Sequence, residues 1–183
     1  MVDRLKVEYD VAVDWLPFFL HPEIPPEGMP LPDHLRTRLQ ASTAHLQQMA
    51  REAGLPMVSP DVIAYSRLAL ESTEYARQKG KLEAFHRAVF RKCYGEGQDV
   101  GRWAVLRAAA EEVGLDANEM QAEVEGGQFS AIIDDHVRQA TEWGITAVPT
   151  YIVGDEYEIV GAQPYSVFEQ VMNRLGVTPK AGL

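Results

Sequence analysis

The stretch from Gly144 to Leu175 constrains the fold of this chain more strongly than any other part of the sequence. Two segments rich in β-branched and aromatic residues, 151–153 and 157–160, flank the three-residue turn Gly154-Asp-Glu156, which is the pattern of a β-hairpin. A helix follows, because Pro164 suits a first helical turn and apolar residues recur behind it at helical spacing. The residues that would pack this helix on the hairpin are Phe168, Val171, Met172 and Leu175.

The N-terminal segment alternates apolar and polar residues from Leu5 to Trp15, a period of two that predicts a β-strand. An alternative places the end of a helix at Tyr9-Asp10 and confines the strand to residues 11–17. The connector 21–32 cannot be helical, because its five prolines remove backbone donors and fix φ.

Between about Asp33 and Trp143 the pattern is helical and shows no convincing strand. Asp33 suits the N-cap of the first helix, and residues 59–61 predict the start of the next one. Asp116 and Glu119 form a variant of the capping box. One amphipathic stripe consists of Leu82, Phe85, His86, Val89, Phe90 and Cys93. The chain thus predicts an α/β layout of strand, long helical insertion, hairpin and helix.

The composition excludes several classes of function. The chain of 183 residues contains 17 Lys and Arg residues and 27 Asp and Glu residues. The resulting net charge of -10 argues against nucleic-acid binding. The apolar run 15–20 is far shorter than a membrane span, so no membrane association is expected. Residues 1–6 lack the apolar core of a signal peptide, and a single cysteine, Cys93, excludes an intrachain disulfide. These features favour a cytoplasmic location.

Five short segments, in this order, resemble the DsbA family of thiol-disulfide oxidoreductases. More closely, they resemble its FrnE-like branch, which is related to the 2-hydroxychromene-2-carboxylate isomerases. The matching segments are Trp15–Gly28, Ser66–Glu71, Glu83–Phe90, Ala147–Thr150 and Gly161–Pro164. The resemblance implies a thioredoxin-like fold with a large all-helical insertion. It divides the chain into a thioredoxin-like domain, residues 1–32 and 144–183, and a helical insertion domain, residues 33–143.

The family fold begins with a strand and a helix that carries a Cys-x-x-C motif, and this chain has neither redox cysteine. The first strand and first helix of the fold are therefore expected to be largely missing, with residues 2–9 as the last turn of that helix. Truncation, a misplaced start at Met1 and natural loss of the motif all remain open. The missing strand would be central, so its neighbours would expose unpaired backbone groups. We expect either a homodimer or a strand at Leu5–Trp15 that fills the gap.

The resemblance places a substrate-binding loop at Val148, Pro149 and Thr150. In the family the peptide bond before such a proline is cis, and the backbone of Val148 would pair with an extended substrate. The alternative interpretation of Pro149 is a turn proline at the start of an edge strand. His21, in the Pro-rich connector, is a weaker candidate at the mouth of the site.

The other reactive side chains give little support for chemistry in this chain. Cys93 lies late in a helix on its apolar stripe, which favours a buried small hydrophobe over a nucleophile. His86, on the same stripe, is interpreted as a packed core residue. His34, His45 and His136 show no metal-ligand spacing with one another or with Cys93, so no metal site is predicted. We predict no catalytic residue in this chain.

Three functions remain open. The first is thiol-disulfide exchange with a protein or small-molecule thiol or disulfide substrate, implied by the resemblance, in which this chain alone would be inactive. The second is a glutathione-dependent isomerase or transferase of the 2-hydroxychromene-2-carboxylate isomerase or kappa class. Glutathione is a candidate cofactor there, and no other cofactor is expected. The third is a non-catalytic module that binds a peptide or a partner subunit.

Overall fold

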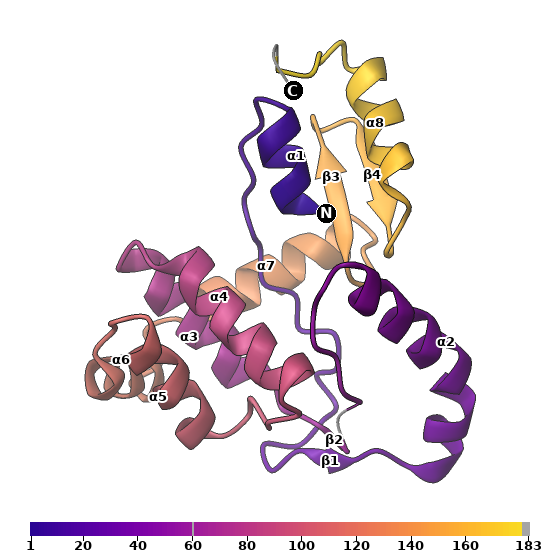
Figure 1. The fold of residues 1–183 in the computed structure, drawn as a ribbon. Coiled ribbons are helices and arrows are strands. Elements are labelled where there is room, and N and C mark those ends of the chain that lie inside the picture. Colours follow the sequence, from indigo (N-terminus) through magenta and orange to yellow (C-terminus); the bar gives the residue numbers. More distant parts are fainter. Residues whose placement is uncertain (60, 181–183) are drawn as a thin grey trace. The chain divides into compact units, whose positions relative to one another are not determined.

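The computed structural model describes residues 1–59 and 61–180, without the side chains of residues 33–42. The chain forms two compact units (Figure 1). Unit 1 comprises residues 1–20 and 136–183, and unit 2 comprises residues 21–135. The sequence placed the domain boundaries at residues 32/33 and 143/144 instead.

Unit 1 is built around an antiparallel hairpin, as its sequence predicts. Its two strands pair from Thr150 opposite Val160 to Val153 opposite Tyr157. Among the described residues, the first strand of the hairpin pairs with the second strand and with no further strand. The elements of this unit are α1 (Val2–Glu8), β3 (Thr150–Val153), β4 (Tyr157–Val160) and α8 (Tyr165–Arg174). Helix α7 (Ser130–Glu142) belongs to this unit from residue 136 onward.

One face of the hairpin is covered by α8 and α1, and this inner face holds the core of unit 1. Phe168 of α8 is fully buried, and its ring meets that of Tyr151 edge-on, with centroids 4.9 Å apart and the planes at 89°. Burying such a side chain stabilises the fold by roughly 1.5–3 kcal/mol. The other buried members of the cluster are Leu5, Tyr9, Ile159, Val171 and Met172.

The predicted strand from Leu5 to Trp15 is wrong, because residues 2–8 form helix α1. Arg4 donates to the Glu8 carboxylate one turn later at 2.6 Å, and Leu5 and Tyr9, four residues apart, are both buried in the core of unit 1. The alternative helix end at Tyr9-Asp10 is confirmed, since Tyr9 is the C-cap. Residues 10–19 have no regular secondary structure, so the strand predicted there is wrong too.

The hairpin turn depends on two residues with positive φ. Gly154 has φ 62° and Asp155 has φ 56°, and the N–H of Glu156 donates to the carbonyl of Val153 at 3.3 Å. A Cβ at Gly154 would also lie 3.1 Å from the side chain of Leu175. Glycine therefore permits the turn geometry and lets the end of α8 pack directly on the turn.

Unit 2 is mainly helical, but the prediction that residues 33–143 contain no strand is wrong. Val62 and Ile63 pair antiparallel with Pro30 and Met29. The elements are β1 (Met29–Pro30), α2 (Asp33–Glu52), β2 (Val62–Ile63), α3 (Arg67–Gln78), α4 (Leu82–Phe90), η1 (Arg91–Gly95), α5 (Trp103–Glu112), α6 (Ala117–Glu125) and the first part of α7.

The helix predicted to start at residues 59–61 begins only at Arg67, because the β-branched pair Val62 and Ile63 is used in the short ladder. Pro60 itself lies outside the described residues. Helix α2 begins at Asp33. Its N-cap is Pro32, so the N-cap predicted at Asp33 is wrong by one residue.

The capping prediction at α6 holds for one of its two residues. The Asp116 carboxylate accepts from the N–H groups of Asn118 at 2.9 Å and Glu119 at 3.0 Å, and these bonds lower its pKa. The Glu119 carboxylate instead accepts from the Tyr75 hydroxyl at 2.7 Å and from Lys79 at 3.0 Å. Burial and then this hydrogen bond raise the pKa of Tyr75. Glu119 thus joins α6 to α3 rather than closing the capping box.

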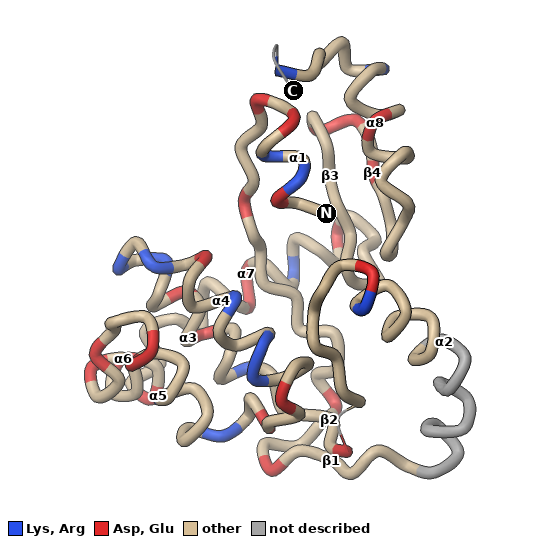
Figure 2. Tube along the Cα trace, in the orientation of Figure 1, with Lys and Arg blue, Asp and Glu red and all other residues tan. Residues whose placement is uncertain are grey.

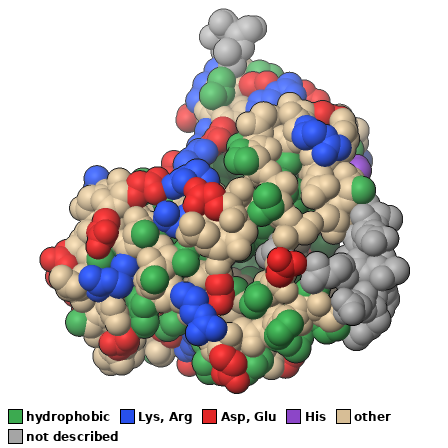
Figure 3. Space-filling model, turned by 60° about the horizontal axis from the view of Figure 1, so that its bottom comes forward, with side chains coloured by type: hydrophobic (Ala, Val, Ile, Leu, Met, Phe, Trp, Pro, Cys, Tyr) green, Lys and Arg blue, Asp and Glu red, His purple; other side chains and the backbone are tan. Residues whose placement is uncertain are grey.

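A buried carboxylate joins α3 to the start of α7. Glu71 is 5% exposed, and its Oε1 accepts from Arg67 at 2.9 Å and from the Ser130 hydroxyl at 3.0 Å. Arg67 also donates to Asp134 at 2.6 Å. Elsewhere, acidic and basic residues are scattered along the trace, and both kinds occur on the face drawn in the space-filling view (Figures 2 and 3).

Replacing Glu71 with alanine is expected to destabilise the protein by about 1–3 kcal/mol, because Arg67 and Ser130 lose a buried acceptor. Urea unfolding followed by circular dichroism measures this change. The exposed Glu125, changed to alanine, is the matched control, with an expected effect below about 0.5 kcal/mol. Equal midpoints for the two variants would contradict the structural role of Glu71.

Candidate functional site

The loop predicted to bind substrate lies directly before β3. The peptide bond between Val148 and Pro149 is cis. The Thr150 hydroxyl donates to the carbonyl of Ala147 at 2.8 Å, and the N–H of Gly161 donates to the carbonyl of Pro149 at 2.7 Å. These two bonds fix the loop to the beginning of β3 and to the end of β4.

The surface of this loop is open. The side chain of Val148 is 50% exposed, and Pro149 is exposed as well. In the part of the chain that the structure describes, the N–H and the C=O of Val148 form no hydrogen bond. A backbone donor and acceptor without a partner, in an exposed apolar residue, can pair with an extended backbone, as in peptide recognition by strand addition.

The loop residues 148–150 contain no acid, base or thiol, so they are able to bind a substrate but not to transfer a proton or an electron pair. The roles predicted for Val148, Pro149 and Thr150 are therefore binding roles, and they stay predictions.

His21 belongs to unit 2, so its predicted place beside the loop also stays a prediction. It is exposed, and its Nδ1 lies 3.0 Å from the Glu23 carboxylate. The pKa of Glu23 is lowered, first by a hydrogen bond from the backbone of Glu23 and then by the hydrogen bond with His21. Both side chains of this pair are exposed to solvent.

Cys93 lies in η1, a single π-helical segment that continues α4, and it packs against the core of unit 2. Burial, and then the charge of Asp99, raise the pKa of its thiol. The neighbouring cations are engaged elsewhere, since Arg91 pairs with Glu96 and Glu112. Its surroundings therefore favour the neutral thiol, which is neither a good nucleophile nor a metal ligand.

His86 is partly buried, and its ring stacks on that of Phe90 with centroids 4.3 Å apart. Burial lowers its pKa, so the neutral imidazole predominates at pH 7. No group of three or more His, Cys, Asp or Glu side chains that could hold a metal occurs among the described residues.

Alkylation of the native protein by iodoacetamide tests the state of Cys93. We expect the rate at pH 7.5 to be below that of the same thiol in the urea-unfolded chain, because burial raises its pKa and limits access. The alkylation rate should increase with pH, and the midpoint of this increase should lie at a higher pH for the native protein than for the unfolded chain. A native midpoint below the unfolded one would show an activated cysteine.

The chain is similar to known proteins of one family. The model of the DSBA-like thioredoxin domain matches residues 1–173. The chain belongs to this family. It is 32% identical over 167 residues to the uncharacterized protein YwbO of Bacillus subtilis (strain 168), covering 90% of this chain and 82% of that protein. The predicted thioredoxin-like fold with a large helical insertion is thus confirmed.

Two solved structures are similar to this member of the family. The probable DsbA oxidoreductase SCO1869 from Streptomyces coelicolor has a TM-score of 0.80 at 24% identity, over 92% of this chain and 77% of that one. A 2-hydroxychromene-2-carboxylate isomerase has a TM-score of 0.69 at 25% identity, over 78% and 69% of the two chains. The fold thus has neighbours in two classes of enzyme.

Among the described helices of this DSBA-like protein, none combines the length and the apolar character needed to cross a bilayer.

Proposed function

We propose that this DSBA-like chain provides the substrate-recognition part of a FrnE-like thiol-disulfide exchange protein. Its loop at residues 148–150 receives a protein or small-molecule thiol or disulfide, and the thiol chemistry is not performed by a residue of this chain. The observation that carries the proposal is the exposed Val148 with an unbonded backbone at the head of β3.

Recognition by this loop follows from backbone geometry. An extended peptide laid beside Val148 forms main-chain hydrogen bonds, each contributing about 0.5–1.5 kcal/mol net. Since these bonds involve only backbone groups, they accept many sequences, as a protein that handles different disulfide substrates requires. The apolar Val148 side chain adds contact area close to the substrate sulfur.

The chemistry sets the limit of the proposal. Thiol-disulfide exchange begins with a thiolate that attacks one sulfur of a disulfide and displaces the other as a thiolate. Cys93 does not supply that thiolate, because burial raises the pKa of its thiol. This chain alone therefore binds substrates without turning them over. A cytoplasmic location and a homodimer, joined through the second edge of β3, form part of the same proposal.

A second candidate function is that of a glutathione-dependent isomerase. The similarity to the 2-hydroxychromene-2-carboxylate isomerase structure favours it. Glutathione is itself a short extended peptide with a thiol, so it would use the same backbone groups of Val148. The two candidates therefore differ in ligand and not in the loop.

The Val148→Glu variant tests the loop. The probe is a blocked pentapeptide, Gly-Leu-Cys-Val-Gly, with its cysteine S-methylated, titrated into the full chain by calorimetry. We expect Val148→Glu to weaken binding about tenfold, or about 1.4 kcal/mol, because a carboxylate must be desolvated where the peptide docks. Val7→Glu, at a valine that is 58% exposed on α1, is the matched control and should bind like the wild type.

Equal affinities of the two variants would contradict the proposed loop. Reduced glutathione is titrated in parallel. Tighter binding of glutathione than of the peptide, lost in Val148→Glu, would favour the isomerase class over the exchange protein.

A further inference from the structure

A cavity of about 470 Å³ opens beside the β3–β4 hairpin, and the sequence patterns gave no sign of it. We name it the hairpin pocket. Its lining residues are Trp143, Ile152, Asp155, Glu156, Tyr157 and Glu158, all of which belong to unit 1. Ile152 and Glu158 are cross-strand partners, and both side chains are exposed. The pocket therefore lies on the outer face of the hairpin, opposite the core around Phe168.

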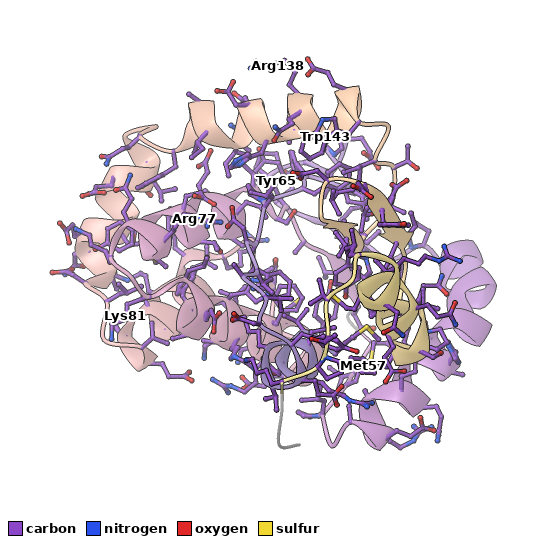
Figure 4. All side chains as sticks on the ribbon, turned by 90° about the horizontal axis from the view of Figure 1, so that it is seen from above. Met57, Tyr65, Arg77, Lys81, Arg138 and Trp143 are labelled. Carbon is purple, nitrogen blue, oxygen red and sulfur yellow. The ribbon has the colours of Figure 1, made fainter. Side chains whose placement is uncertain are left out.

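The apolar part of the pocket is exposed to solvent. The side chain of Trp143 is 53% exposed and that of Ile152 is 44% exposed. Trp143 lies at the C-terminal end of α7 (Figure 4), where Gly144, with φ 72°, ends the helix. The N–H of Ile145 donates back to the carbonyl of Ala140 at 2.9 Å. The backbone at Trp143 is thus fixed by the helix end, and its side chain is exposed. Exposed aromatic residues on rigid elements are typical anchors of interfaces.

The polar part of the pocket is uniformly negative. Asp155 and Glu156 belong to the turn, and Glu158 follows in β4. Within residues 1–59 and 61–180, no ion pair or side-chain hydrogen bond engages any of these carboxylates. The C-terminal end of α7 adds the negative end of a helix dipole beside Trp143. Both sources of charge favour a cation in the pocket.

The three carboxylates are not a metal centre, since the described residues contain no cluster placed to hold a metal ion. The indole face points instead to an organic cation. A guanidinium stacks on tryptophan and donates in parallel to a carboxylate, and its weak hydration makes it easier to dock than an ammonium group. An aliphatic neighbour would cover Ile152.

We propose that the hairpin pocket docks an arginine-bearing, otherwise aliphatic peptide segment of a partner protein. The guanidinium stacks on Trp143 and donates to Glu158, with Asp155 and Glu156 completing the negative rim. The flanking aliphatic side chains lie on Ile152. This interaction goes beyond the proposed function, because the pocket shares no residue with the loop at 148–150.

The test uses the full chain and the blocked pentapeptide Ala-Leu-Arg-Leu-Ala, followed by ¹H–¹⁵N NMR. The chain has three tryptophans, so three indole N–H signals report separately. We expect the signal of Trp143 and the amides of Ile152 and Glu158 to shift on titration. The same peptide with citrulline, the neutral isostere of arginine, should bind at least about tenfold more weakly, because charge-assisted hydrogen bonds are lost.

Charge-neutralising variants distinguish the loss of a pocket carboxylate from a general effect on folding. Glu158→Gln and Asp155→Asn should each weaken binding of the arginine peptide several-fold, and asparagine tolerates the positive φ of Asp155. Glu125→Gln, which removes the same charge from an exposed site in unit 2, is the matched control and should bind like the wild type. Unchanged amide spectra away from the pocket show that each variant is folded.

Three results would overturn the proposal: equal binding of the citrulline peptide, an unshifted Trp143 signal, or equal weakening by Glu125→Gln. Concentration-dependent shifts of the Trp143 signal without peptide would assign the face to a second copy of the chain and also contradict it. The loop variant Val148→Glu should not weaken binding of this peptide, so failure of the pocket and failure of the loop are distinguishable.

Discussion

Burial of Phe168 against the inner face of the β3–β4 hairpin is the contact on which unit 1 depends. A two-stranded hairpin is marginally stable in water, so it needs a helix packed on one face. Here α8 supplies that helix and Leu5 and Tyr9 of α1 complete the cluster. The close packing of Leu175 on Gly154 extends the same contact to the hairpin turn.

This one-sided core leaves the other features of the hairpin available for binding. The loop at residues 148–150 precedes β3, and the hairpin pocket includes the turn that follows it. The pocket also includes Trp143 and Ile152, which lie on either side of the loop in the sequence, so the two features share no residue but are close along the chain. The loop offers neutral backbone groups, and the hairpin pocket offers negative charge beside an indole. Their ligands therefore differ in chemistry, although the same packed helix holds both in place.

Elements with strong local signals could be predicted from the sequence. The hairpin and α8 were predicted from the sequence. The turn residues of the hairpin and the helical spacing of the apolar residues in α8 agree with the core that these two elements form. The N-terminal alternation was misleading, since residues 2–8 fit a helix equally well and the burial of Leu5 and Tyr9 decides the outcome. The pairing of Val62 and Ile63 with a segment about thirty residues earlier is non-local, and no short-range pattern reveals it.

The loop at Val148–Thr150 could be predicted because its residues are contiguous and resemble a family motif. The hairpin pocket could not, because it depends on the register that places Ile152 opposite Glu158 and on where α7 ends. Similarly, Glu119 has the spacing of a capping box but binds Tyr75, which only the packing of α6 on α3 determines.

Reduction of insulin disulfides by dithiothreitol, followed by turbidity, tests most directly whether this chain binds substrates without exchanging disulfides. We predict that the chain leaves the rate at that of dithiothreitol alone, and that Cys93→Ser has no effect. An acceleration that is lost in Cys93→Ser would contradict it, because Cys93 would then be a working thiolate.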